Sequence, residues 1–384
     1  WFSMGSDTAD VNNDGLPDLM GSDMAGTSHF RQKVAMGDMY QWGWFLEQGT
    51  PRQYMRNVLY VNTGTGRFLE AAYLAGLDAS NWTWSVKFGD LNNDGLVDVF
   101  ISNGMTREWF NSDLREQSLA VKNQGGEQAW DAFWRDQSEQ RESNLAFENR
   151  GDLQFKSAGK AWGLDYLGVS FGAALGDLDQ DGDLDLVVNN FEEPVSLYRN
   201  NGSDGQVVKL HLHGQASNRF GIGATVRIQT SAGQQVRYLT MSRGFMSAND
   251  PIVHFGLGQH ETIDRLTVEW PSGHVQGFDN IPANRFYKIT EPNGAPPPRT
   301  LPALVPTMFR TAKAMPRIRH NEKPFNDFQR QPLLPQKLSQ LGPGLACGDI
   351  DGDENDDLFV GGAAGQAGCV ILNHGDGRFE SLSA

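Results

Sequence analysis

The chain has 384 residues, of which 39% are hydrophobic, with 44 Gly, 10 Trp and a formal net charge of −15. This length allows two or three domains. The acidic balance argues against nucleic acid as a partner, because the sequence has no basic stripe that could release counterions from phosphates. No apolar run approaches the roughly 18 residues of a membrane span.

Four acidic loops of one design recur along the chain, and the first lies at residues 10–18. Oxygen-bearing side chains stand at loop positions 1, 3, 5 and 9, the backbone carbonyl of position 7 can join them, and a Gly at position 6 permits a sharp turn. Hard oxygen ligands in a flexible ring suit Ca²⁺ better than Mg²⁺. We therefore predict up to four Ca²⁺ sites. The predicted ligands are Asp10, Asn12, Asp14, Leu16 and Asp18 in the first loop, Asp90, Asn92, Asp94, Leu96 and Asp98 in the second, Asp177, Asp179, Asp181, Asp183 and Asp185 in the third, and Asp349, Asp351, Asp353, Asn355 and Asp357 in the fourth.

An isolated acidic turn is often only a turn, and four matches at the same positions are what favour calcium. The fourth loop departs from the pattern because Glu354 stands at position 6. The loops are not EF-hands, which need a Glu at position 12 between two helices. Alternating or β-branched segments, such as residues 84–88 and 97–102, flank the second loop and indicate strands instead.

A second signature, Asn-x-Gly between short apolar segments, follows each acidic loop and begins at Asn62, Asn149, Asn200 and Asn373. Turns of this composition join antiparallel strands. Each unit then contains a strand, the acidic loop, a strand, a connection, a strand, a turn and a last strand. This order predicts an all-β fold of four-stranded antiparallel propeller blades, each of which needs neighbours to bury its faces.

Two blades carry long connections between their second and third strands. Residues 24–56 are rich in Met, Trp and Gln, and residues 105–143 have a helical pattern with many aromatic residues. We predict that these aromatic side chains cap the rim of the propeller, with a ligand surface as the alternative. His29, in the first insert, is the His that we would test for a functional role.

After the third blade, residues 206–291 alternate in short segments separated by Gly and Pro, which predicts a small all-β domain. Gly221-x-Gly223 is not a dinucleotide loop, because no third Gly and no helix pattern follow it. His211 and His213 alternate on one predicted strand and could share a metal, although a solvent-facing pair is the favoured interpretation. The chain is Pro-rich over 292–343, typical of a linker.

At this point the sequence resembles known families. The repeated units are similar to FG-GAP/VCBS repeats, the blades of integrin-α-like propellers, with Phe88-Gly89-Asp90 and Phe171-Gly172-Ala173 echoing the Phe-Gly element. Residues 206–291 resemble the ASPIC/UnbV domain of cartilage-acidic-protein-like proteins; the matching residues are 218–224, Arg243, Gly244, Ser247, 254–258 and 270–273. The resemblance implies a calcium-binding protein outside the cytosol and carries no established catalytic residues.

The predicted organisation is therefore three blades over 1–205, the β-domain over 206–291, the linker over 292–343 and a further blade over 344–384. Closed propellers use about four to eight blades, so we expect a piece of a longer chain. Cys347 and Cys369 fall on the first and third strands of the last blade, about 9.6 Å apart at the strand spacing and beyond the reach of a disulfide. We predict buried free thiols.

The functional prediction is a calcium-stabilised scaffold for binding or adhesion, with a protein or carbohydrate ligand and no catalytic residue. Weak calcium sites of the extracellular type, with Kd of order 10⁻⁴ to 10⁻³ M, place it in an extracellular, cell-surface or periplasmic location. One alternative is a polysaccharide-acting enzyme whose site is built from the two inserts. Another is a structural component of a surface layer or filament. The oligomeric state stays open.

Overall fold

A computed structural model of the chain describes residues 3–36, 55–202, 204–294, 315–331, 334 and 337–383. Strands dominate these residues and helices are few, so the all-β prediction is confirmed. The chain divides into two compact units, the first formed by residues 1–37 and 49–299 and the second by 38–48 and 300–384. Among the described residues, no helix combines the length and the apolar character needed to cross a membrane.

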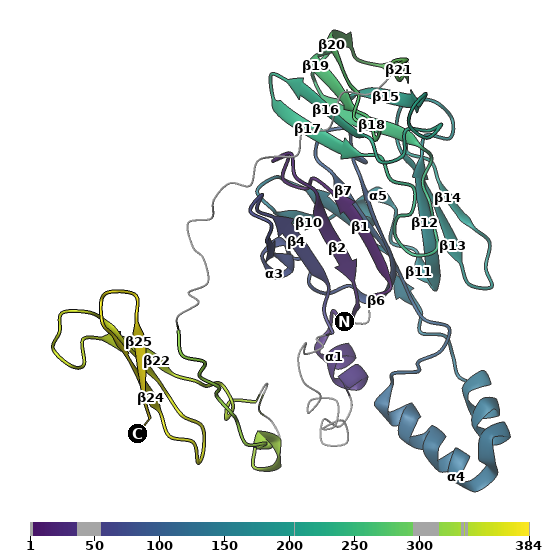
Figure 1. The fold of residues 1–384 in the computed structure, drawn as a ribbon. Coiled ribbons are helices and arrows are strands. Elements are labelled where there is room, and N and C mark those ends of the chain that lie inside the picture. Colours follow the sequence, from purple (N-terminus) through teal and green to yellow (C-terminus); the bar gives the residue numbers. More distant parts are fainter. Residues whose placement is uncertain are drawn as a thin grey trace. The chain divides into compact units, whose positions relative to one another are not determined.

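The first unit begins with two antiparallel sheets that correspond to the first two predicted blades (Figure 1). The first sheet contains, in order, β1 (Gly5–Ala9), β2 (Asp18–Ser22), β4 (Val58–Asn62) and β5 (Phe68–Glu70). The second contains β10 (Phe155–Ser157), β9 (Leu145–Asn149), β7 (Asp98–Asn103), β6 (Asn81–Gly89) and the short β3 (Met24–Ala25). Short helices α3 (Ala72–Ala75) and α5 (Gly159–Trp162) follow the outer strands.

The third sheet corrects the prediction of four strands per blade. Within the described part of the chain it holds three, β12 (Ser170–Gly176), β13 (Asp185–Asn190) and β14 (Ser196–Tyr198). After the Asn200-x-Gly202 turn the chain leads into a strand of the β-domain, where its hydrogen bonds are taken by other strands. A two-stranded ribbon, β11 (Leu167–Gly168) with β8 (Glu142–Ser143), lies before β12.

The middle blade is buried on both faces, which is why its central strand lacks alternating polarity. All six residues of β7 are buried. Val99 and Ile101 pack into a core with the first blade, whereas Phe100 packs into a second core with Ala173 and Leu175 of the third. Successive side chains of a strand point to opposite faces, so one strand serves both interfaces. The inner strands β1, β6 and β12 contact one another in series.

The β-domain packs two sheets around its own core, which includes Val208, Leu210, Phe255 and Trp270. One sheet contains β18 (Ile252–Gly258), β15 (Gln206–His213) and β21 (Arg285–Thr290), and the other contains β17 (Gly233–Tyr238), β16 (Thr225–Thr230), β19 (Thr262–Glu269) and β20 (Val275–Pro282). The first and last strands of the domain, β15 and β21, pair in parallel. This long-range closure was not predicted.

The second insert is helical, as predicted, with α4 (Ser112–Arg135) kinked at Gly126, whose φ is 73°. Its aromatic residues cluster, with the Trp109 and Trp134 ring centroids 4.6 Å apart, and Phe110 packs on Trp82 of the blade at 4.7 Å. In the first insert, α1 (His29–Met36) contacts α4. Residues 37–54 of that insert, with five of its aromatic residues, lie outside the described residues.

In the second unit, four antiparallel strands follow in chain order, β22 (Leu345–Gly348), β23 (Asp357–Val360), β24 (Cys369–Asn373) and β25 (Phe379–Ser383), after a 3₁₀ turn η1 (Asp327–Gln329). Cys347 and Cys369 are free and have β23 between them, as expected. The prediction that both are buried is wrong. Cys347 is exposed, as is Leu345 of the same strand, and in the described residues β22 is an edge strand that pairs with β23.

Candidate metal centre

Each acidic loop closes a hairpin between two neighbouring antiparallel strands of its sheet, and all four loops share one backbone conformation. Positions 4 and 6 have positive φ in every loop: Asn13 55° and Gly15 87°, Asn93 57° and Gly95 95°, Gln180 64° and Gly182 110°, Gly352 80° and Glu354 69°. Glycine adopts this conformation without a steric cost. In the fourth loop the Gly stands at position 4 and Glu354 takes the left-handed conformation at position 6. The departure from the sequence pattern therefore leaves the loop geometry intact.

The Asp at position 9 ties each loop to the Asn-x-Gly turn of the same sheet. One oxygen of Asp98 accepts the backbone N–H of Leu91 and the other that of Asn149, both at 2.9 Å. The Asn149 amide donates to the carbonyl of Val97 at 3.0 Å. The same paired contacts join Asp18 to Val11 and Asn62, Asp185 to Leu178 and Asn200, and Asp357 to Ile350 and Asn373. The acidic loop and the Asn-x-Gly turn of each sheet therefore form one structural element.

The carboxylates of the third and fourth loops converge. One oxygen from each of Asp177, Asp179 and Asp185 lies within 4.8 Å of the others, and the same holds for Asp349, Asp351 and Asp353. In the first two loops, the described residues do not bring three carboxylates this close, and position 3 holds an Asn. There the Asn side chain donates to the Asp of position 5 at 3.0 Å, from Asn12 to Asp14 and from Asn92 to Asp94.

Coordination of a metal by the backbone carbonyls of position 7 remains a prediction. The backbone N–H groups of Leu16 and Leu96 donate to the position 5 carboxylates at 2.8 Å, which orients the peptide groups around the loop centre. Asn355 does the same toward Asp353 at 2.8 Å. Asp183 also donates its N–H to Asp181, but its side chain turns toward the second loop and accepts from Asn93.

Burial makes the first two loops electrostatically unfavourable without a cation. Together with the neighbouring carboxylates, it raises the pKa of Asp90 to about 7 and that of Asp98 to about 8. Burial also raises the pKa of Asp10 to about 6. In the exposed fourth loop, hydrogen bonds from Asn373 and Ile350 lower the pKa of Asp357 instead. A divalent cation would relieve the repulsion where the carboxylates are most buried.

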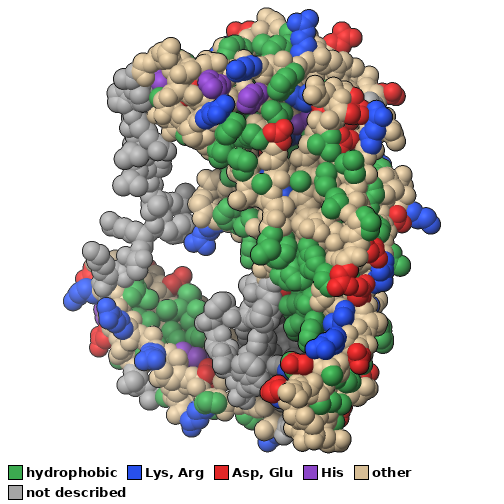
Figure 2. Space-filling model, turned by 90° about the vertical axis from the view of Figure 1, so that its right-hand side faces the viewer, with side chains coloured by type: hydrophobic (Ala, Val, Ile, Leu, Met, Phe, Trp, Pro, Cys, Tyr) green, Lys and Arg blue, Asp and Glu red, His purple; other side chains and the backbone are tan. Residues whose placement is uncertain are grey.

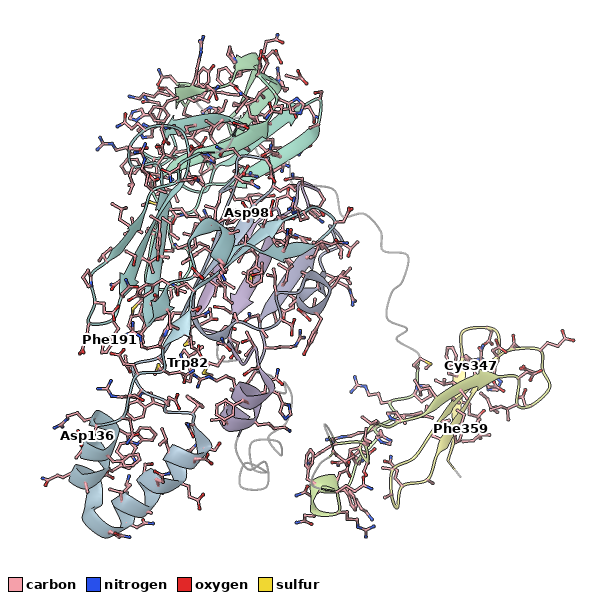
Figure 3. The ribbon with its side chains drawn as sticks, turned by 180° about the vertical axis from the view of Figure 1, so that it is seen from behind. Trp82, Asp98, Asp136, Phe191, Cys347 and Phe359 are labelled. Atoms are coloured by element: carbon pink, nitrogen blue, oxygen red, sulfur yellow. The ribbon has the colours of Figure 1, made fainter. Side chains whose placement is uncertain are left out.

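The first three loops lie together beneath the β-domain, and we call residues 10–18, 90–98 and 177–185 the loop cluster. Figure 3 shows Asp98 at the end of the blades that meets the β-domain, with Trp82 at the opposite end beside the inserts. Neighbouring loops are joined by Asn13, which donates to the Gly95 carbonyl at 3.2 Å, and by Asn93, which donates to Asp183. The candidate calcium loops therefore form part of a domain interface.

Strands β17 and β18 of the β-domain contact the backbone of the loop cluster. The Tyr238 hydroxyl donates to the Gly15 carbonyl at 2.9 Å, and the Gly258 N–H donates to the Asn93 carbonyl at 2.8 Å. His254 Nε2 lies 2.9 Å from the Gly182 carbonyl, and burial lowers the pKa of this His to about 4. The β-domain thus recognises the backbone at the tips of all three loops.

A short segment of the β-domain inserts between the inner strands of the first two blades. Arg243 Nε pairs with Asp7 at 2.7 Å and Nη2 donates to the Phe88 carbonyl at 2.8 Å. The next residue, Gly244, donates its N–H to the Ser6 carbonyl at 2.8 Å, and a Cβ there would lie 2.2 Å from the Ser85 hydroxyl. Only glycine fits this approach.

Beside this contact, the loop cluster and the β-domain enclose a cavity of about 350 Å³, with Lys209, Arg237, His254 and the cluster residues Asp90 and Asp177 in its wall. A second pocket, between the two inserts, has only about 30 Å³. Sites for small molecules usually measure about 300–1,000 Å³. Within the described residues, the site with the volume of a small-molecule pocket is therefore the one at the loop cluster.

The sequence alone does not predict these contacts, because the partners lie far apart along the chain. Tyr238 and Gly15 are 223 residues apart, and His254 and Gly182 are 72 apart. No local pattern marks such pairs. The His residues that were singled out have other environments: His29 is exposed at the start of α1, and His211 stacks between the rings of Phe220 and Phe286 rather than forming a metal face with His213.

The fold and the loops are those of an all-β protein built from repeated acidic hairpins with an additional β-domain, and comparison with known families finds two that parts of the chain resemble. The model of the family described as "FG-GAP-like repeat" matches residues 48–101, and that of the family described as "ASPIC and UnbV" matches residues 214–296. Both predicted resemblances are confirmed.

Among individual proteins, the chain is similar to cartilage acidic protein 1. It is 25% identical to the protein of Mus musculus over 249 residues and 26% identical to that of Homo sapiens over 253 residues. The match to the Xenopus tropicalis protein is also 26% identical, over 252 residues. In each case the alignment covers 57% of this chain and 38% of the relative, so the chain spans less than half the length of the relatives it matches.

Proposed function

We propose that the protein is a calcium-binding β-propeller scaffold for binding or adhesion, in which Ca²⁺ stabilises the blade hairpins and their contact with the β-domain. The observation that carries this proposal is the shared conformation of the four acidic loops, each with two left-handed residues and an anchored Asp at position 9. A plain turn needs no such repeated arrangement of carboxylates.

The donor chemistry of the loops fits calcium. Carboxylate, amide and backbone oxygens are hard ligands, and loops that gather them in a flexible ring favour Ca²⁺ over Mg²⁺. The four nine-residue loops hold 17 carboxylates, more than the net charge of −15. When bound, Ca²⁺ neutralises this charge, and binding is coupled to folding because the repelling groups are brought together only in the folded chain.

The location of three loops at the domain interface sets the role of the metal. Asp10, Asp90 and Asp177 each belong to a hairpin that the β-domain contacts through Tyr238, Gly258 or His254. Metal bound in these hairpins would hold the loop tips in the conformation that the β-domain recognises. Calcium would therefore stabilise the assembly of blades and β-domain as well as each hairpin.

We further propose an extracellular, cell-surface or periplasmic location, because weak calcium sites fill only where calcium is abundant. The similarity to cartilage acidic protein 1 supports this assignment. Exposed apolar side chains on the third blade support a role in assembly. They are Leu178, Val195 and Leu197, and Figure 2 shows hydrophobic side chains spread over this side of the first unit. A protein or carbohydrate ligand is the expected partner.

The test is a count of bound calcium. Equilibrium dialysis of the wild-type chain should find up to four Ca²⁺ per molecule, and Asp94→Ala should remove one. Asp264→Ala, an exposed Asp of β19 outside the loops, is the matched control and should leave the count unchanged. No bound calcium at millimolar concentration would refute the proposal.

The enzyme alternative required a pocket built from the inserts. In the described residues the pocket there, lined by Arg31, Glu142 and Phe110 among others, has a volume of about 30 Å³, below the roughly 300 Å³ of typical ligand sites. The alternative of a surface layer or filament component predicts that the purified chain self-associates, which light scattering would detect.

A further inference from the structure

The third acidic loop differs from the other three at the Asp of position 1. In the first, second and fourth loops, Oδ1 of this Asp accepts the backbone N–H of position 5, at 3.0 Å for Asp10, 3.1 Å for Asp90 and 3.2 Å for Asp349. Oδ1 of Asp177 has no hydrogen-bond partner, although its side chain is only 6% exposed. A buried carboxylate oxygen without a donor is costly and calls for an explanation.

The explanation is a Lys of the β-domain. The Lys209 ammonium contacts Asp177 Oδ2, the oxygen that also accepts the Gly182 N–H at 3.0 Å. The Lys209 side chain is 15% exposed, and its Nζ lies 5.8 Å from the centre of the Phe286 ring. The contact leaves Asp177 with both of its donors on one oxygen.

Lys209 is held in this position by the sheet. It lies on the central strand β15, opposite His254 of β18 and Phe286 of β21. His254 contacts the Gly182 carbonyl of the same loop. Two adjacent side chains of the β-domain therefore engage one acidic loop, one through its carboxylate and the other through its backbone.

We propose that the Lys209 ammonium is a tethered cation of the third loop, which Ca²⁺ must displace from Asp177 in order to bind there. This inference rests on the proposed calcium function. Asp177 is a predicted ligand, and its oxygens converge with those of Asp179 and Asp185. Calcium in that cluster would stand a few ångströms from the ammonium, and the repulsion between the two cations is strong in a buried site.

A cavity beside Lys209 can accept its side chain when calcium displaces it. Lys209 and Asp177 both line the cavity of about 350 Å³, whose wall also includes the exposed Asp250. A Lys side chain is flexible and carries its charge at the tip, so it can turn into this space without moving β15. Calcium binding to the third loop would then replace the contact of Lys209 with the blade by a position inside the cavity, near Asp250 of the β-domain.

A second cationic side chain, that of Arg199, lies near the third loop and should affect its calcium affinity less than Lys209 does. Arg199 Nε lies 2.7 Å from Asp179 and Nη2 lies 3.7 Å from Asp181, but the Arg199 side chain is 67% exposed. Exposed ion pairs contribute little to stability. The buried Lys209 contact is therefore the one expected to set the calcium affinity of the third loop.

The first experiment compares calcium affinities by titration calorimetry. Asp181→Ala identifies the third site as the one that disappears from the wild-type isotherm. Lys209→Met keeps the apolar stem and removes the charge, and it should tighten binding at the third site roughly tenfold, within the usual range of coupling between two binding events. Lys209→Arg retains the charge and should keep the wild-type affinity. Lys288→Met, an exposed Lys of the adjacent strand β21, is the control for net charge.

The second experiment uses the wild-type chain and so does not depend on the folding of a variant. The rate of Lys209 acetylation by a soluble reagent, measured by mass spectrometry, should rise when EGTA is replaced by saturating Ca²⁺, while that of Lys288 stays constant. The rise should be absent in Asp181→Ala.

The outcomes separate the two proposals. If Asp181→Ala binds as many calcium ions as the wild type, the third loop is not a calcium site and the proposed function fails there. If Asp181→Ala binds one calcium ion fewer, the third loop is a calcium site. If in addition Lys209→Met has wild-type affinity and the rate of Lys209 acetylation does not change with calcium, the tethered-cation proposal alone is overturned.

Discussion

The Asp98 carboxylate and the Asn149 backbone N–H are 2.9 Å apart although 51 residues separate them along the chain. This contact joins the acidic loop of the second blade to its outer turn, across the whole helical insert. The Asn149 side chain extends the link by donating to the carbonyls of Val97 and, in the neighbouring blade, Val11. One fully buried Asn therefore connects a loop, a turn and two blades.

Asn149→Ala tests this connection. The substitution leaves the carbonyls of Val11 and Val97 buried without their donor, and each such group costs about 1–3 kcal/mol. We expect the free energy of unfolding to fall by about 2–4 kcal/mol in urea denaturation. Asn201→Ala, at an exposed position of the third turn, is the matched control and should have a small effect. Equal stability of the two variants would contradict the role of Asn149.

Removal of calcium should lower the melting temperature. At a free calcium concentration of ten times Kd, each site adds about 1.4 kcal/mol to the free energy of unfolding, and EGTA removes this contribution. Differential scanning calorimetry should show a smaller calcium-dependent shift for Asp94→Ala than for the wild type, with Asp264→Ala unchanged. An identical melting temperature with and without EGTA would argue against the calcium sites.

The stability of the metal-free protein should decrease as the pH rises through the neutral range. The pKa values of Asp90 and Asp98, about 7 and 8, lie above their ordinary value of 3.8, so the folded state binds these protons more tightly than the unfolded state does. Their contribution to stability is present below pH 4 and is lost as the pH rises toward 8. In EGTA the melting temperature should fall between pH 5 and 8. Saturating calcium should reduce or reverse that fall, because the metal binds the ionised carboxylates.

Glu291 should be essential to the β-domain. Its carboxylate accepts the backbone N–H groups of Gln215, Ala216 and Ser217 at 2.7–2.9 Å and is fully buried. Burial alone would raise its pKa, but these hydrogen bonds, with those of Ser272 and His274, hold the pKa at about 2. Glu291→Ala leaves a cluster of buried donors unpaired and should destabilise the domain by about 3 kcal/mol or more.

The same group predicts acid sensitivity. Because the folded pKa lies below the ordinary value of 4.5, the stabilisation from Glu291 is fully present above pH 4.5 and is lost as the pH falls toward 2. Urea denaturation of the wild type should show this loss, and Glu291→Gln should show less of it. Parallel pH profiles for the two proteins would disprove the assignment.

Docking of the β-domain should depend on the buried pair of Arg243 and Asp7, whose side chains are 19% and 1% exposed. Removing one partner of such a pair leaves an uncompensated charge and costs about 3–5 kcal/mol. Arg243→Met should therefore speed proteolysis between the third blade and the β-domain, and the double variant with Asp7→Asn should recover part of the loss. A strictly additive double-mutant cycle would show that the two residues act independently.

Local sequence determined the features whose parts lie close together in the chain. The acidic loops, their flanking strands and the Asn-x-Gly turns each occupy about ten residues or fewer, so spacing and turn chemistry were enough to place them, including the loop that carries Glu354. The pattern over 105–143 likewise predicted the helix α4, because periodicity is a local property. The strand content of residues 206–291 followed from alternation in the same way.

Tertiary structure alone decided which of these pieces meet. The third sheet has three strands in the described residues, and the next strand, β15, pairs with β18 and β21 of the β-domain, because hydrogen bonds to a β-strand can be supplied by partners anywhere in the chain. Lys209 reaches Asp177 and Tyr238 reaches Gly15 across 32 and 223 residues. Such contacts depend on the packing of whole sheets, which no spacing in the sequence encodes. The loops were therefore predictable, whereas their position beneath the β-domain was not.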